Sequence, residues 1–171
     1  VPLIGAGLSA YRVGDPPVIE IGHSLPAIGK ATLITVLVTE PKRGVHALEV
    51  RFVQGKKSRT VKQQEFATKP AWMLWGGAPS PVQVELTVGA DSIPDIDVGE
   101  GTIEVTAYAA ETWMFAPAPV QRKLTLPVRL VPPTLEVTSD HIYVAQGGCE
   151  AVTYRVSETS IKDGVKAGNW F

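Results

Sequence analysis

The stretch Val84-Glu85-Leu86-Thr87-Val88 alternates apolar and polar side chains at every step. Residues on a β-strand point alternately to opposite faces, so this pattern predicts a strand with one buried face in an antiparallel sheet. The same alternation occurs in Ile103-Glu104-Val105-Thr106-Ala107 and in residues 124–130. The continuous apolar run at residues 33–38 instead predicts a strand that is covered on both faces. The alternation of apolar and polar side chains therefore predicts an all-β fold.

Working outward from these stretches, similar segments recur between turns rich in Gly, Pro and Asp. We expect strands near residues 17–22, 31–39, 46–54, 59–66, 82–89, 102–109 and 123–131. Seven short strands of this kind predict an all-β fold, an immunoglobulin-like antiparallel β-sandwich. Because Pro127 lacks a backbone donor, the last strand should lie at a sheet edge or be bulged there.

Pro132-Pro133 marks the expected end of the sandwich, because two prolines stiffen the chain and do not fit inside a sheet. Beyond it, alternation restarts at Leu135-Glu136-Val137, but residues 134–171 are few for an independent core. A second β module or a short β appendage packed on the sandwich would both fit, and we favour the module. The expected organisation is an N-terminal extension at 1–14, an immunoglobulin-like β-sandwich at 15–131 and a partial second β module at 134–171.

The composition excludes several classes of protein. The chain has 171 residues, of which 44% are hydrophobic, so it can bury a core. Its net charge of -1, from 16 Lys+Arg and 17 Asp+Glu, gives no electrostatic reason to expect nucleic acid as a partner. No apolar run approaches the roughly 20 residues that cross a bilayer, so we expect no transmembrane segment. Residues 1–8 are apolar but lack the basic residues and cleavage site of an export signal.

Catalytic and metal-binding patterns are missing from the sequence. His23, His46 and His141 lie far apart, and there is no H-x-H, H-E-x-x-H or C-x-x-C. The single cysteine, Cys149, has no histidine or cation at a spacing that would activate a thiolate. We therefore expect no catalytic residue, no metal and no other cofactor. The acidic loop at 91–100 does not match EF-hand spacing, and a solvated turn is favoured over a calcium site.

Aromatic residues gather in two connections between strands. Trp72, Met73 and Trp75 lie in a proline-rich connection, and Trp113 and Phe115 follow the sixth expected strand. Tryptophan buries a large area when it is covered, so these residues predict an interaction surface. They can pack on each other or on a neighbouring domain, or form a platform for sugar rings. Packing is favoured, since no set of Asp, Asn or Arg accompanies them.

Basic residues gather at the expected hairpin between the third and fourth strands, namely Lys56, Lys57, Arg59 and Lys62. An anionic glycan or a membrane surface could bind there. Lysines on an edge hairpin also discourage association between sheets, and this explanation is favoured because it needs no ligand.

A resemblance to a known family lies in three segments near the C-terminal end, namely residues 144–150 (Val-Ala-Gln-Gly-Gly-Cys-Glu), 152–156 and 163–171. They resemble the non-catalytic N-terminal region of bacterial LytM/lysostaphin-type zinc metallopeptidases, which are peptidoglycan endopeptidases. Residues 17–21 (Pro-Val-Ile-Glu-Ile) and 27–32 (Ala-Ile-Gly-Lys-Ala-Thr) are similar to the start of the immunoglobulin-like domain that precedes the peptidase in such proteins.

The family holds its zinc with an H-x-x-x-D element and the second His of an H-x-H, and neither occurs in this sequence. The resemblance therefore carries over no catalytic residue, and we expect the chain itself not to be an enzyme. It implies a non-catalytic extracytoplasmic module, periplasmic or extracellular, that acts as a spacer or regulatory region of a cell-wall peptidase. The implied partners are a downstream catalytic domain of the same polypeptide and peptidoglycan or envelope proteins. The alternative is an adhesion or glycan-binding module that uses the Trp-rich loops.

Overall fold

The computed structural model describes residues 15–70, 72–73, 79–112, 115–139, 147–149, 151–160 and 163–166. The chain divides between Val128 and Arg129 into two compact units, called unit 1 and unit 2. Pro132-Pro133 lie inside unit 2, close to this division. The described residues form strands, turns and irregular segments, without a helix. The all-β fold class predicted from the alternation is confirmed.

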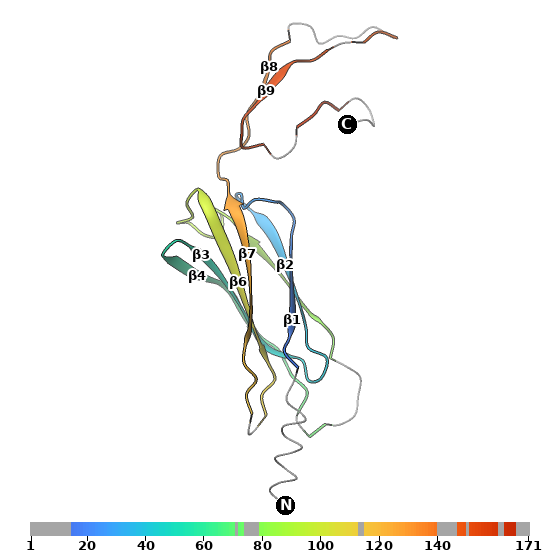
Figure 1. The fold of residues 1–171 in the computed structure, drawn as a ribbon, viewed down its shortest axis with the longest axis vertical. Helices are drawn as coiled ribbons and strands as arrows, with labels where there is room; N and C mark the ends of the chain where they lie inside the picture. The colour runs from blue at the N-terminus through green and yellow to red at the C-terminus, as the bar shows by residue number, and fades with distance from the viewer. Residues whose placement is uncertain are drawn as a thin grey trace, which may run out of the picture. The chain divides into compact units, whose positions relative to one another are not determined.

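Unit 1 is a sandwich-like arrangement of two antiparallel sheets (Figure 1). Its described strands are β1 (Val18–His23), β2 (Thr32–Thr39), β3 (Val45–Gln54), β4 (Lys57–Glu65), β5 (Val82–Val88), β6 (Gly99–Ala109) and β7 (Val120–Val128). The first sheet has the order β1-β2-β5, and the second has the order β4-β3-β6-β7. β7 pairs only with β6 in this sheet, and Pro127 lies opposite Glu100. The predicted edge position of Pro127 is therefore confirmed.

The core lies between the inward faces of the two sheets. Ile34, Val36 and Val38 of β2 are fully buried, as are Ile103 and Val105 of β6. Such side chains stabilise a sandwich by roughly 1.5–3 kcal/mol each when they leave water.

The outward face of β2 is less covered than the sequence predicts. Leu33 is 42% exposed, and the outward-facing Thr35 and Leu37 are only half-buried. The prediction of a strand covered on both faces is therefore wrong. β2 is central in its sheet, with β1 and β5 as neighbours, but the other sheet covers only one of its faces.

The chain enters and leaves the sandwich at opposite ends. β1 begins at Val18, opposite Thr39, whereas β7 ends at Val128, which forms a parallel bridge with Ile28 in the β1–β2 connection. Because β1 and β2 are antiparallel, these two places lie at opposite ends of the strands (Figure 1). We call them the entry end, with the connections at 40–44, 66–81 and 110–119, and the exit end, with those at 24–31, 55–56 and 89–98.

The described part of unit 2 is also β-structure. β8 (Leu135–Val137) and β9 (Tyr154–Val156) form a two-stranded antiparallel sheet. The Tyr154 hydroxyl donates a hydrogen bond to Asp163 Oδ2 at 3.0 Å. This hydrogen bond is the main reason that the pKa of Tyr154 is raised above its ordinary value.

Candidate functional site

A buried carboxylate organises the entry end of unit 1. Glu40, which is 2% exposed, accepts hydrogen bonds from the backbone N–H groups of Asp15, Lys42, Arg43 and Gly44. Gly44 has a φ of 93°, a conformation in which a side chain would be strained, so the turn needs glycine there. The carboxylate thereby satisfies donors that no strand pairing satisfies, and it ties the 40–44 turn to the segment that enters β1.

A buried guanidinium connects two further loops at this end. Arg43 is 5% exposed, and its Nε donates to the carbonyl oxygen of Lys69 at 2.9 Å. Its Nη1 donates to the carbonyl oxygens of Glu111 at 2.6 Å and Ala110 at 3.4 Å. Arg43 therefore holds the β4–β5 and β6–β7 connections, which carry the aromatic residues singled out in the sequence. We call Glu40 and Arg43 together the entry-end clamp.

The described aromatic residues lie in these two connections. Trp72 is 67% exposed and Phe115 is 41% exposed, while Met73 is half-buried. Trp75 and Trp113, the other members of the predicted interaction surface, lie outside the described residues. The clamp thus brings the segments of Trp72 and Phe115 to the same end of unit 1, and it leaves both side chains accessible.

A local hydrogen-bond pattern fixes the position of Phe115. Thr112 Oγ1 donates to the Phe115 carbonyl oxygen at 3.0 Å and accepts from the Phe115 N–H at 3.1 Å. The Thr112 N–H also donates to that carbonyl oxygen at 2.9 Å. The loop at this point is therefore closed by its own polar groups, with the Phe115 ring at the surface.

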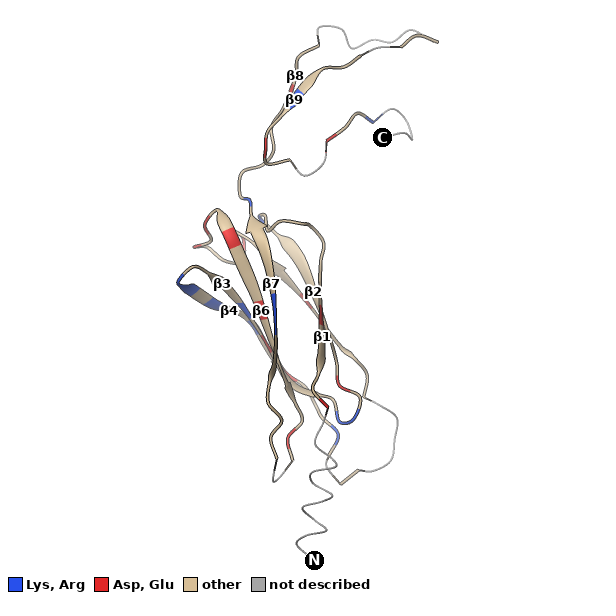
Figure 2. Ribbon diagram, in the orientation of Figure 1, with Lys and Arg blue, Asp and Glu red and all other residues tan. Residues whose placement is uncertain are grey.

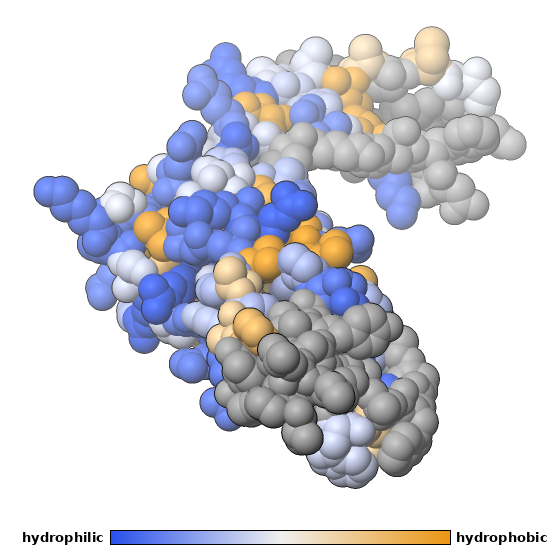
Figure 3. Space-filling model, turned by 60° about the horizontal axis from the view of Figure 1, so that its bottom comes forward, coloured by the Kyte–Doolittle hydropathy of each residue, from blue (hydrophilic) through white to orange (hydrophobic). Residues whose placement is uncertain are grey.

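Hydropathy separates the sides of the sandwich. Figure 3, with the entry end turned forward, shows hydrophilic residues along the side that carries β3 and β4, and hydrophobic residues in small separate groups.

The predicted basic cluster begins at the tip of the β3–β4 hairpin with Lys56 and Lys57 and continues along β4 with Arg59 and Lys62 (Figure 2). Lys57 Nζ forms an ion pair with Asp97 Oδ2 at 2.9 Å. The hydrogen bond to Asp97 is the main cause that raises the pKa of Lys57 above its ordinary value. Both side chains are exposed, so the pair contributes little stability.

The acidic loop at 91–100 is held to the same hairpin. The Asp97 N–H donates to Gln54 Oε1 at 2.9 Å, and Gln54 Nε2 donates to the Asp97 carbonyl oxygen at 2.6 Å. Within the part of the chain that the structure describes, no three His, Cys, Asp or Glu side chains gather closely enough to hold a metal ion. The loop is arranged by contacts with β3 and β4.

Among the residues that the structure describes, the histidines and the cysteine do not lie close together. His23 Nδ1 lies 3.0 Å from the carbonyl oxygen of Leu25, and His46 is exposed on β3. Cys149 is exposed and unpaired in unit 2, while His141 lies outside the described residues.

Sequence reasoning missed the entry-end clamp. The segment Glu40-Pro41-Lys42-Arg43-Gly44 resembles an ordinary charged turn, and charged residues in turns are normally solvated. The partners of Arg43 lie 26 to 68 residues away in sequence, so no local spacing could indicate them. The only available signal was a glutamate four residues before a glycine in a turn between apolar strands.

Comparisons with protein-family models, curated proteins and solved structures found no match to this chain. None of the described residues forms a helix that is long and apolar enough to span a membrane.

Proposed function

We propose that this chain is a non-catalytic, extracytoplasmic β-sandwich module that serves as a spacer or regulatory region of a cell-wall metallopeptidase. The observation that carries the proposal is the path of the chain through unit 1, which enters beside Asp15 and Glu40 and leaves at Val128 at the opposite end. A module with this path separates whatever precedes it from whatever follows it by the length of its strands. β7 alone, with 9 residues, spans about 30 Å.

The immunoglobulin-like type of the sandwich is part of this proposal. The order β3-β6-β7 corresponds to the C-F-G order of immunoglobulin domains, and β1-β2-β5 corresponds to A-B-E. β4 pairs with β3 rather than with β5, which would make it a C′ strand. Domains of this type are common in extracellular and cell-surface proteins.

The link to a cell-wall peptidase rests on the sequence resemblance described above. It predicts that the gene encoding this chain continues beyond the codon for Phe171 with H-x-x-x-D and H-x-H elements. It also predicts that the isolated chain hydrolyses no peptidoglycan and contains no stoichiometric zinc. A metal assay that finds one zinc per chain, or a continuing reading frame without those elements, would overturn the proposal.

A second candidate function is glycan binding or adhesion through the entry end. It is favoured by the exposure of Trp72 and Phe115, whose connections Arg43 holds at one end of unit 1. Saturable binding of a peptidoglycan fragment should then be lost in Trp72→Ala. Val98→Ala is the matched control, because Val98 is equally exposed, at 67%, but lies at the exit end. A flat titration with unchanged Trp fluorescence would rule this candidate out.

A further inference from the structure

The inward face of β4 has no strand opposite it. The second sheet has four strands and the first has three. β1 contacts β7 on one side of the sandwich, so β5 and β4 form the edges on the other side. Because the larger sheet extends beyond the smaller one there, inward-facing side chains of β4 border a space rather than the core.

A β-bulge turns the basic residues of β4 toward this space. Arg59 lies opposite Phe52, and Lys62 lies opposite Val50, with a register shift between Val50 and Arg51. Directly opposed residues of an antiparallel pair share a face, and Phe52 and Val50 are buried in the core. In a regular strand, Arg59 and Lys62 would point to opposite faces because they are an odd number of residues apart. The bulge places both on the inward face.

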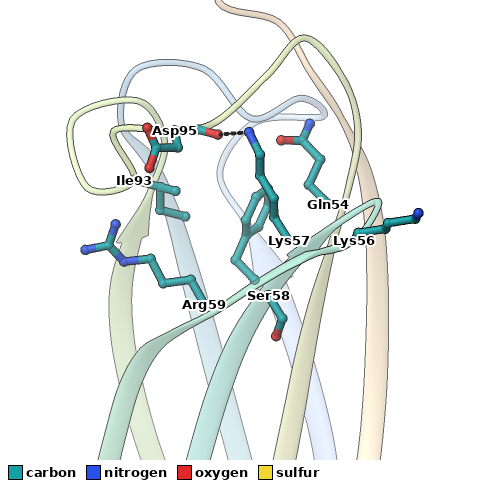
Figure 4. Close-up of a pocket in the computed structure, with 8 residues that line it drawn as sticks. Gln54, Lys56, Lys57, Ser58, Arg59, Ile93 and Asp95 are labelled. Carbon is teal, nitrogen blue, oxygen red and sulfur yellow. Dashed lines mark hydrogen bonds between the residues drawn. The ribbon is translucent and has the colours of Figure 1, made fainter.

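Two adjoining hollows result, which we call together the β4 recess. The first has a volume of about 440 Å³ between the hairpin tip and the 89–98 connection (Figure 4). The second has a volume of about 290 Å³ between β4 and the edge of β5. Arg59 and Ile93 line both hollows, so they form the point where the two meet. The first hollow is of the size that holds small ligands.

The cations of the recess are only partly neutralised. Lys57 is paired with Asp97, and its Nζ lies 3.3 Å from the Asp95 carbonyl oxygen, as Figure 4 shows. Lys62 Nζ donates to a backbone carbonyl oxygen of β5 at 3.1 Å. The guanidinium of Arg59 has no hydrogen bond or ion pair with any described residue, and Figure 4 shows this side chain on the opposite side of the hollow from Lys57.

Carboxylates also border the recess, and they limit what it can bind. Asp95 lines the first hollow, and Glu85 lines the second. The Glu85 carboxylate accepts a hydrogen bond from Gln83 Nε2 at 3.2 Å. Lys56 also lines the first hollow without an ion pair to a described residue, and Lys62 contacts only a neutral carbonyl oxygen. Arg59 is the cation that lines both hollows, so positive charge is available where the two join.

We propose that the β4 recess binds the carboxylate or phosphate groups of an acidic, non-peptide ligand, with Arg59 as the anchor. A guanidinium binds such groups through two parallel hydrogen bonds, which gives both strength and orientation. Protection of the sheet edge accounts for cations on β4, but it does not require a hollow around an unpaired arginine. An added peptide strand is disfavoured, because the bulge interrupts the row of backbone groups with which it would pair.

The test is an NMR titration of the full chain with inorganic triphosphate and, separately, with citrate. We expect saturable shifts of amide signals in β4 and in residues 89–98, with a Kd below about 1 mM for one of the two probes. Arg59→Gln should weaken binding about tenfold or more, since it removes a charge-assisted contact. The control is Arg122→Gln, which makes the same change of charge on β7, the other edge strand of the same sheet. It should change the Kd by less than about twofold.

Either probe supports the proposal, and the tighter one identifies the anionic group. Equal weakening by the two variants would show that only the overall charge matters, and it would overturn the proposal. The proposal would also be overturned if the amide shifts occurred only outside the recess, or if no shifts occurred at probe concentrations below about 10 mM. Tighter binding of an oligoglutamate peptide than of both probes would overturn the non-peptide assignment. None of these outcomes depends on the proposed link to a peptidase.

Discussion

Replacing Glu40 by alanine should destabilise unit 1 more than most single changes of a charged residue. The carboxylate accepts four backbone N–H groups, and two of these, from Arg43 at 2.7 Å and Gly44 at 2.5 Å, are buried bonds. The bonds from Asp15 and Lys42 are only partly buried, so water can replace the carboxylate there. A buried donor without a partner costs about 1–3 kcal/mol, so the two buried donors together cost about 4 kcal/mol.

This loss is large relative to the stability of a typical domain. Native domains are stable by about 5–15 kcal/mol, and a loss of about 4 kcal/mol lowers the midpoint of thermal unfolding by roughly 15 °C in a domain of this size. Urea denaturation gives the free energy of unfolding, and calorimetry gives the midpoint. Glu40→Gln should lose about half as much, because its remaining carbonyl oxygen still accepts hydrogen bonds.

Glu65→Ala is the matched control, since Glu65 is exposed at the end of β4. Exposed substitutions of this kind change stability by about 0.5 kcal/mol or less. If the free energy of unfolding of Glu40→Ala lies within that margin of the control, then the carboxylate does not hold the entry end together, and the account of the clamp is wrong.

Two further predictions concern the exit end. In Gly89→Ala the added Cβ would overlap the backbone carbonyl oxygen of Lys30, whereas in Gly22→Ala its nearest neighbour lies at 3.8 Å. Gly89→Ala should therefore lower the thermal midpoint sharply and Gly22→Ala only slightly; similar midpoints would contradict the packing. The raised pKa of Lys57 means that its contact with Asp97 is complete below the ordinary lysine pKa and is lost as pH rises through the raised value. The Asp97 amide signal should shift in that alkaline range, and Lys57→Met should abolish the step; a step that persists in the variant would refute the assignment.

Most strands could be predicted from the sequence because a strand with one buried face has alternating apolar and polar residues. β5 and β6 begin and end within a few residues of the predicted ranges, since each alternates between core and solvent, and β2 does so because of its apolar run. β7 differs more, because it covers Val120–Val128 rather than residues 123–131. Residues 121–123, after Val120, are polar, but they pair with β6 through backbone hydrogen bonds that no side-chain pattern indicates.

The candidate sites were harder to predict, because they depend on contacts between residues distant in sequence and on a local irregularity. Aromatic residues in loops predicted an interaction surface, which stays a prediction; the structure shows that Trp72 and Phe115 are exposed. The residues that place their segments, Glu40 and Arg43, act through backbone groups distant in sequence. The direction in which Arg59 points depends on a bulge, which reverses the alternation on which sequence reasoning relies. Long-range pairing and local irregularity are therefore the two properties that the sequence did not reveal.

The geometry of unit 1 allows a spacer and a binding module to be the same object. The segment before β1 lies at the entry end and β7 ends at Val128 at the exit end, while the β4 recess runs from the hairpin tip at the exit end along the edges of β4 and β5. β1 and β7, the first and last strands, lie together on the other side of the sandwich. The strands that join unit 1 to the rest of the chain are thus separated from the strands that border the recess. Arg59→Gln therefore changes neither β1 nor β7, so anion binding can be lost in this variant while the spacing between the two ends of unit 1 stays unchanged.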